Sequence, residues 1–355
     1  MIKLSAVLAT VLTANAVAQA PTNYPSPVEA DYVIRNFVFT TGDTMPELRI
    51  HYTTIGKPSP DGRNGVLIMH GTGGSGRGFL SQTFGGQLFG PGQLLDATKY
   101  FIILPDGIGH GKSSKPSDGQ RMRFPKYTYN DMVKAQYLLV TEGLHLPHLR
   151  LVMGTSMGAM HSWVWGYTYP DFMDALMPLA SNPVEIAGRN RMMRQMIIDD
   201  IENDPDWKQG EYTTQPVRGL TSAQHILMLM TSVPLQWQKD APTRAQSEAM
   251  LKQRVTRALA TADANDMIYA YEASREYNPA PHLEQIKASL FAINSADDQV
   301  NPPELGILDR EIKRVPKGRY ILIPISDQTR GHGTHSLPAI WGKYLAELLG
   351  SSEPR

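Results

Sequence analysis

The residues best placed to do chemistry lie in the pentapeptide Gly-Thr-Ser-Met-Gly, residues 154–158, which directly follows the apolar run 149–153. This is the pattern G-x-S-x-G, in which small residues flank a serine at a sharp turn from a strand into a helix. Such a turn exposes the serine Oγ above the edge of a sheet, at the N-terminus of the next helix. A stretch typical of a helix, 159–167, follows. The pattern therefore predicts Ser156 as a nucleophile.

A serine nucleophile needs a general base, and the base needs a carboxylate that orients it. The chain order serine, aspartate, histidine is met by two loops, each of which follows a predicted strand. The strand 290–293 leads to a turn with Asp297 and Asp298, and the strand 320–324 leads to a loop with His332 and His335. Open α/β sheets bind their ligands at this carboxyl edge. The sequence therefore predicts a Ser-Asp-His triad.

Each loop offers two candidates for its role. We favour Asp298 as the acid because it comes last before the chain leaves the turn, and we expect Asp297 to cap the turn or to face solvent. We favour His332 as the base because it lies nearer the strand end, which leaves His335 for the loop surface or the pocket wall. Whether Asp297 or His335 assists the triad stays open.

The glycine-rich loop 70–76 follows the predicted strand 66–69 and is suited to form an oxyanion hole. Glycines allow the backbone to present N–H groups to a developing negative charge. We expect the backbone N–H groups of Thr72 and of Met157, the residue after the nucleophile, to form this pair. The His70 ring is expected to support the loop.

Two segments resemble phosphate-binding loops, and neither makes a convincing match. Residues 71–76 fit G-x-G-x-x-G, with Asp96 at about the distance of a ribose contact, but the following stretch 77–92 is too rich in glycine for a firm helix. In the segment 106–113, Asp106 stands where a phosphate loop needs its first glycine. We therefore expect no organic cofactor, and the proposed chemistry needs no metal.

Composition and spacing suggest one large domain with an insertion. The chain has 355 residues, is 41% hydrophobic and 19% charged, and has a net charge of zero, so nothing points to a nucleic-acid partner. The predicted fold is α/β, with a mostly parallel sheet flanked by helices. We expect its core at 30–181 and 284–350 and an inserted helical cap at 182–283. Methionine-rich helical patterns in the cap are expected to pack in its core and to line an adaptable pocket.

The N-terminus is typical of a secretory signal peptide, residues 1–20. A short basic start precedes the apolar stretch 4–17, and the sequence Ala-Gln-Ala at 18–20 is a cleavage pattern. The absence of cysteine fits export without disulfides. The expected location is therefore secreted or periplasmic, and no later segment is long enough to span a membrane.

Several motifs resemble those of the homoserine O-acetyltransferase group of α/β-hydrolases over most of the predicted mature chain. Residues 130–136 read Asn-Asp-Met-Val-Lys-Ala-Gln, where the family has Arg-Asp-Met-Val-Arg-Ala-Gln. Similar matches cover 155–161, at the turn that carries Ser156, and 204–220 in the predicted cap. The family's Asp-Gln-Leu-Phe-Pro matches 298–302, and its Gly-His-Asp matches 331–333. The resemblance implies an α/β-hydrolase fold with Asp298 and His332 in the triad.

The same resemblance implies that the family's grip on homoserine is lost. The family aspartate that holds the amine is Gly333 here, and its carboxylate-binding arginine and tyrosine are Gln224 and Thr231. A buried zwitterion without counter-charges is strongly disfavoured. We therefore expect an exported serine hydrolase that takes a small acyl substrate, a carboxylic ester or less favourably an amide or lactone. An acyl-CoA-dependent O-acyltransferase is the alternative, and a homodimer stays open as the assembly.

Overall fold

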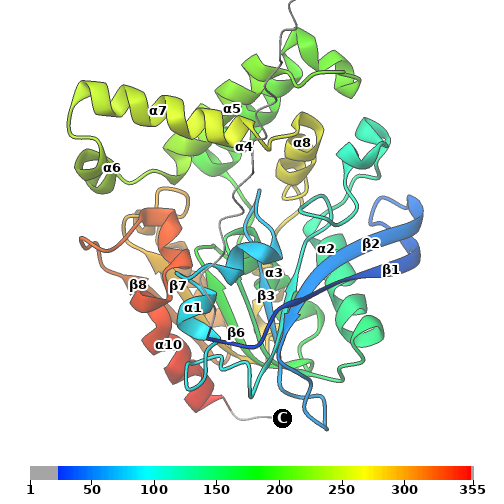
Figure 1. Ribbon diagram of the computed structural model, residues 1–355. Coiled ribbons are helices and arrows are strands. Elements are labelled where there is room, and N and C mark those ends of the chain that lie inside the picture. The colour runs from blue at the N-terminus through cyan, green and yellow to red at the C-terminus, as the bar shows by residue number, and fades with distance from the viewer. Residues whose placement is uncertain (1–22, 353–355) are drawn as a thin grey trace, which may run out of the picture.

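An eight-stranded sheet forms the centre of the computed structural model, which describes residues 23–352 (Figure 1). The predicted signal peptide, residues 1–20, lies outside the described residues. The strand order is β1-β2-β4-β3-β5-β6-β7-β8. Neighbours pair in parallel from β4 through β8, whereas the β1–β2 and β2–β4 pairs are antiparallel. The strands are β1 Val28–Val38, β2 Thr44–Ile55, β3 Gly65–Met69, β4 Phe101–Pro105, β5 Leu149–Thr155, β6 Met173–Leu179, β7 Ser289–Ser295 and β8 Gly318–Ile323.

Helices cover both faces of the sheet, which explains why the inner strands read as continuous apolar runs. Every residue of β3, β4, β5 and β6 is buried. Alternate side chains of β3 enter different cores: Leu67 and Met69 pack on the side of α2 and α3, and Val66 and Ile68 on the side of α1 and α10. These helices are α1 Gly85–Leu88, α2 Tyr129–Leu138, α3 Met157–Thr168 and α10 Pro338–Ser351. The predicted α/β class with a mostly parallel sheet is confirmed.

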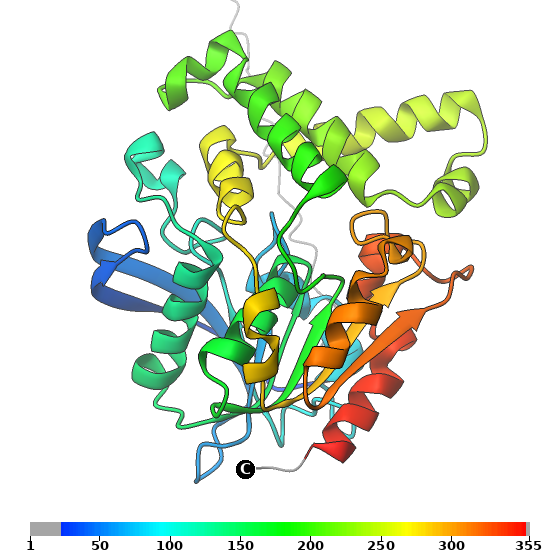
Figure 2. The same cartoon turned by 180° about the vertical axis from the view of Figure 1, so that it is seen from behind.

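Five helices between β6 and β7 in the chain lie together at one end of the sheet (Figures 1 and 2). They are α4 Gly188–Glu202, α5 Val217–Thr231, α6 Pro234–Asp240, α7 Arg244–Leu259 and α8 Ala264–Glu272. Aliphatic side chains of α4, α5 and α8 form a core of their own, separate from the two cores of the sheet. We call these five helices the cap; the boundaries 182–283 expected for it stay a prediction.

The methionines of the cap are less buried than their helical spacing suggests. Met192 and Met196 are exposed on α4, so the expectation that such stripes pack inside is wrong for these two. Their helix buries a different face, which carries Arg194, Ile197, Ile198 and Ile201. Met230 of α5 is buried, as expected.

Two further features were not specified by the sequence patterns. The long β1–β2 hairpin adds two antiparallel strands at one edge of the sheet. A short helix, α9 Ile307–Glu311, precedes β8. Within residues 23–352, no helix combines the length and the apolar character that crossing a membrane requires.

Candidate active site

Ser156 occupies a strained turn between β5 and α3. Its φ of 54° and ψ of −109° lie in a region that non-glycine residues rarely adopt. A Cβ on Gly154 would lie 2.3 Å from the Gly158 backbone, and one on Gly158 would lie 2.0 Å from the Met69 carbonyl oxygen. The turn can therefore form only because both flanking residues are glycine.

Three predicted side chains meet above the carboxyl ends of the strands. The Ser156 Oγ lies 2.8 Å from His332 Nε2, and His332 Nδ1 lies 2.9 Å from Asp298 Oδ2. Asp298 follows β7, and His332 lies in the short 3-10 helix Gly331–Ser336 after β8. Because a carboxylate can only accept, Nδ1 carries the proton and Nε2 is free to accept from the serine hydroxyl. This arrangement can deprotonate Ser156 as it attacks a carbonyl.

The Asp298 carboxylate is fully buried and fully bonded. Its Oδ1 accepts from the Val300 N–H at 2.8 Å, and its Oδ2 also accepts from the Asn301 amide at 3.2 Å. Burial alone would raise the pKa of Asp298. The His332 ring and the donors from Asn301 and Val300 outweigh burial, so the pKa lies below its usual value of 3.8. Asp298 is therefore ionised and fixed in orientation.

The two alternative residues lie close by but make other contacts. Asp297 is buried, with one carboxylate oxygen bonded to the Ser295 hydroxyl and the other accepting from Thr329 Oγ1 at 2.8 Å. It thus links the end of β7 to the loop after β8, and of the two roles expected for it, capping the turn or facing solvent, burial excludes the second. His335 packs edge-on against His332 with ring centroids 5.3 Å apart, and its Nδ1 contacts Ser336. Among residues 23–352, neither side chain hydrogen-bonds to Ser156.

The loop after β3 lies directly beside the nucleophile. A Cβ on Gly71 would lie 3.3 Å from the Ser156 Cβ, so glycine permits this close approach. In the described part of the chain, the N–H groups of Thr72 and Met157 have no hydrogen-bond partner. Both are therefore available to an oxyanion on a substrate bound at Ser156.

His70 and Asp106 hold this loop in place. His70 Nδ1 donates to the Gly71 carbonyl at 2.8 Å, and its Nε2 accepts from the Gly107 N–H at 3.0 Å. Burial lowers the pKa of His70 to about 4, so the ring is neutral with one defined tautomer. Asp106 accepts from the Gly76 N–H at 2.7 Å and the Lys112 N–H at 2.8 Å. Both carboxylate oxygens of Asp106 thus accept from backbone N–H groups of the protein. At the position where a phosphate loop has its first glycine, Asp106 holds two loops together.

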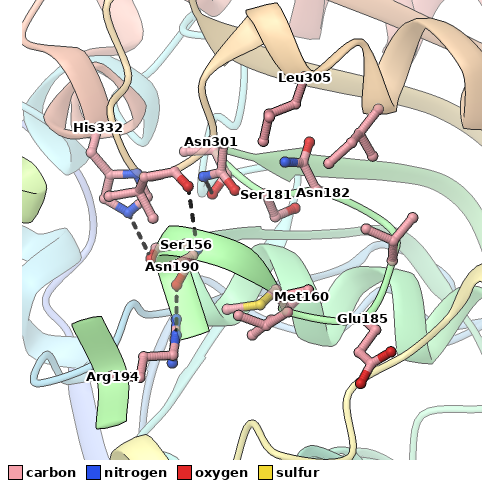
Figure 3. Close-up of a pocket in the computed structure, with 16 residues that line it drawn as sticks. Ser156, Met160, Ser181, Asn182, Glu185, Asn190, Arg194, Asn301, Leu305 and His332 are labelled. Carbon is pink, nitrogen blue, oxygen red and sulfur yellow. Dashed lines mark hydrogen bonds between the residues drawn. The ribbon is translucent and has the colours of Figure 1, made fainter. Parts of the chain in front are cut away.

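A cavity of about 530 Å³ opens onto the triad between the sheet and the cap. The glycine-rich loop 70–76, which we call the oxyanion loop, forms one wall. Leu227, Met230 and Tyr271 of the cap form another. A smaller recess of about 60 Å³ adjoins the same serine and histidine (Figure 3). Ser156, His332, Val300 and Arg194 line both spaces.

Comparisons with known proteins agree with this architecture. Residues 65–324 match the family model described as alpha/beta hydrolase fold. The chain belongs to the α/β-hydrolase family. A homoserine O-acetyltransferase of Haemophilus influenzae is 30% identical over 281 residues, which cover 72% of this chain and 77% of the relative. A probable acyltransferase of Methanothermobacter thermautotrophicus is 29% identical over 306 residues, covering 85% and 91%.

Solved structures of the same fold include an acetylester hydrolase from Corynebacterium glutamicum. It superposes with a TM-score of 0.81 at 23% identity, covering 91% of this chain and 96% of that one. The predicted membership of the homoserine O-acetyltransferase-like group of α/β-hydrolases is confirmed. Proteins that share this fold thus include both transferases and esterases.

Two neighbouring cavities include the positions where the family's homoserine contacts were expected to be lost. Thr231 and Gly333 line the 530 Å³ cavity beside the triad. Gln224 lines a neighbouring cavity of about 660 Å³, which shares the loop 72–75 with the first. The second cavity also contains Lys115, Asp263 and Asp266.

The α4 helix contacts the loop that carries Asp298. Asn190 Nδ2 donates to the Val300 carbonyl at 3.2 Å, and Arg189 Nη2 donates to the Gln299 carbonyl. Neither residue carries a sequence signal for this role, since nothing in the run 189–194 distinguishes surface from buried polar groups. The cap therefore helps to hold the acid loop.

The aspartates of the two segments that resemble phosphate-binding loops bond to backbone groups of the protein, Asp106 as described above. Asp96 accepts from the N–H groups of Gly92 and Thr98 within its own turn. Residues 23–352 contain no group of three or more histidine, cysteine, aspartate or glutamate side chains arranged to hold a metal ion.

Proposed function

We propose that this α/β-hydrolase is an exported serine hydrolase that cleaves a carboxylic ester through an acyl-enzyme on Ser156. The observation that carries the proposal is the chain of contacts from Ser156 through His332 to Asp298, at distances of 2.8 and 2.9 Å, beside a cavity of about 530 Å³. Esterase names among the solved structures of the same fold agree with it.

The reaction would follow from the positions of the protons. His332 Nε2 takes the Oγ proton as Ser156 attacks the ester carbonyl, while Asp298 stabilises the resulting imidazolium. The Thr72 and Met157 N–H groups donate to the tetrahedral oxyanion. His332 returns the proton to the departing alcohol oxygen, which leaves the acyl group on Ser156. Water then gives a proton to His332 and attacks the acyl-enzyme, and as the tetrahedral intermediate collapses His332 passes that proton to the Ser156 Oγ, which releases the carboxylic acid and the free serine.

The alternative is an acyltransferase, favoured by the names of the relatives that match most of the chain. In that reaction an alcohol replaces water at the acyl-enzyme. Two features argue against acyl-CoA and homoserine as substrates. Asp263 and Asp266 line the second cavity with Lys115 as the nearby cation, which is unfavourable for a polyanionic cofactor. Thr231 and Gly333 also leave the cavity at Ser156 without a carboxylate for the homoserine amine.

An assay of both reactions decides between these functions. We expect measurable hydrolysis of a neutral short-chain aryl ester and negligible homoserine-dependent release of CoA from acetyl-CoA. Three lost contacts, each worth about 1.5–3 kcal/mol for a charged partner, would weaken homoserine recognition by several orders of magnitude. Efficient, saturable CoA release that depends on homoserine would restore the transferase function.

Export is tested separately by the N-terminus of the processed chain. Cleavage after Ala20 gives a mature protein that begins at Pro21. Mass spectrometry of protein expressed in a bacterial host should find this terminus in the periplasm or medium. Recovery of the intact chain from the cytoplasm, still beginning at Met1, would contradict export.

A further inference from the structure

The buried face of α4 carries an arginine where its spacing calls for an apolar residue. Arg194 lies one turn before the buried Ile197 and Ile198 and two turns before the buried Ile201, and only 3% of its own surface is exposed. Burying a guanidinium is costly unless a counter-charge compensates. Such a residue therefore needs either a carboxylate of the protein or one from a ligand.

The protein supplies neutral partners to Arg194. Its Nε donates to Asn190 Oδ1 at 2.9 Å, and its Nη1 donates to Ser274 Oγ at 3.1 Å. The guanidinium carbon lies 5.6 Å from the centre of the Tyr271 ring. Among residues 23–352, Arg194 forms no ion pair, and its Nη2 has no hydrogen-bond partner. The group is therefore oriented but not neutralised.

Arg191, one turn earlier on α4, provides a contrast. It pairs with Glu272 at 3.4 Å and does not line either space beside the triad. The two arginines share a helix and differ in whether the protein supplies the counter-charge.

Arg194 is also placed beside the reacting groups. It lines both the 530 Å³ cavity and the smaller recess, as Ser156 and His332 do. It is the sole lysine, arginine, aspartate or glutamate among the described residues that line the larger cavity. Glu185 borders the recess, but it is exposed and lies on the side away from Arg194 (Figure 3). The lining of the 530 Å³ cavity therefore carries a net positive charge.

We propose that Arg194 binds a carboxylate of the substrate, so that the favoured substrates are esters that carry a free carboxylate. This inference rests on the proposed hydrolase function and names its substrate class. A planar guanidinium held by two neutral partners is suited to a carboxylate, which accepts charge-assisted hydrogen bonds from its free donors. A zwitterion such as homoserine would satisfy Arg194 but leave its ammonium without a partner, whereas a monoanionic ester is fully matched.

Matched substrate pairs test this proposal and locate the carboxylate. For the acyl side, the mono-4-nitrophenyl ester of adipic acid is compared with 4-nitrophenyl hexanoate. For the alcohol side, 4-acetoxybenzoate is compared with 4-acetoxybenzamide. We expect the wild-type enzyme to favour the carboxylated member of at least one pair in kcat/KM. Arg194→Met should reduce that preference about ten- to a hundredfold, the effect of one lost charge-assisted contact.

Controls separate recognition from folding. Arg194→Lys should keep part of the preference, and Arg191→Met should keep all of it. Arg194 also bonds to Asn190, which contacts the loop of Asp298, so the preference is measured as the ratio of kcat/KM for the two members of a pair, in which a general loss of activity cancels. If Arg194→Met does not fold, competitive inhibition of the wild type still decides, because benzoate should inhibit more strongly than benzamide.

Two results would overturn the proposal. One is a wild type that shows no preference for the carboxylate in either substrate pair and none between benzoate and benzamide. The other is an Arg194→Met variant that loses carboxylated and neutral activity equally, which would make Arg194 a structural residue. Failure of the proposed hydrolase function is distinct, because the wild type would then cleave no ester at all.

Discussion

Buried polar groups have different partners in the cap and in the rest of the molecule, the sheet with its flanking helices and loops, which we call the sheet domain. In the sheet domain, Asp298 has every oxygen engaged, and His70 has both ring nitrogens engaged. In the cap, Arg194 is equally buried but lacks a counter-charge. The catalytic groups are thus fixed before substrate arrives, whereas the cap keeps one charge to be satisfied by the substrate. Chemistry and selectivity are assigned to different parts of the chain.

The largest effect is expected from removing the nucleophile of the sheet domain. Ser156→Ala should lower kcat for ester hydrolysis by about four orders of magnitude or more while the fold is kept. Ser162→Ala is the matched control, since this buried serine of α3 donates to the Gly158 carbonyl and lines neither space at the triad. Near-normal turnover by Ser156→Ala would refute the assignment of the nucleophile.

A second prediction separates the two neighbouring aspartates. Asp298→Asn should cost about a thousandfold or more in kcat, because an amide can no longer hold His332 in the required tautomer. Asp297→Asn should cost no more than about tenfold, since its contacts with Ser295 and Thr329 only connect two loops. Steady-state kinetics on one neutral ester gives both values. Comparable losses in the two variants would show that Asp297 takes part in orienting the base.

The sequence was sufficient to predict the parts of the site that depend on local backbone geometry. Glycines on both sides of Ser156 are required by the turn itself, and loops after parallel strands must meet at one edge of the sheet. The choice of Asp298 over Asp297 was favoured by position, and the structure then placed Asp298 rather than Asp297 beside His332. The fold class followed from the same pattern of strands and loops.

The cap could not be predicted in the same way. On α4, residues 191–196 read Arg-Met-Met-Arg-Gln-Met, and which face is buried depends on α5 and α8, which follow later in the chain. Hydrophobicity alone favours burying Met192 and Met196, but the helix buries Arg194 and leaves both methionines exposed. Tertiary packing decided the outcome, so the residue of greatest interest in the cap gave no sequence signal.

The free energy of unfolding should depend on pH in part through His70, the buried neutral histidine that holds the oxyanion loop in place. The folded-state pKa of His70, about 4, lies below its usual value of 6.5, so the unfolded chain binds the proton first as pH falls. The stabilisation of the folded state by neutral His70 is complete above pH 6.5 and is lost progressively as the pH falls to about 4. His70→Gln should therefore flatten the fall in unfolding free energy by up to about 1.4 kcal/mol per pH unit in this window. The exposed His225→Gln is the control, and an unchanged slope in His70→Gln would contradict a buried neutral His70.

The smallest effect tests which face of α4 the cap buries. Met192→Ser should change the free energy of unfolding by less than about 0.5 kcal/mol, because the side chain is exposed. Ile198→Ala on the buried face should cost about 2–4 kcal/mol. Urea unfolding of both variants measures the difference. A large cost for Met192→Ser would show that this face contacts another surface.

Labelling with a fluorophosphonate tests the central claim most directly, since the reagent traps an activated serine without any assumption about substrate. Peptide mapping by mass spectrometry should find one equivalent of label on the peptide that contains Ser156, and the Ser156→Ala variant should remain unlabelled. Loss of His332 or Asp298 should slow the labelling of Ser156 strongly. Label on a different residue, or none on Ser156 under conditions where the enzyme cleaves esters, would contradict the triad as the origin of activity.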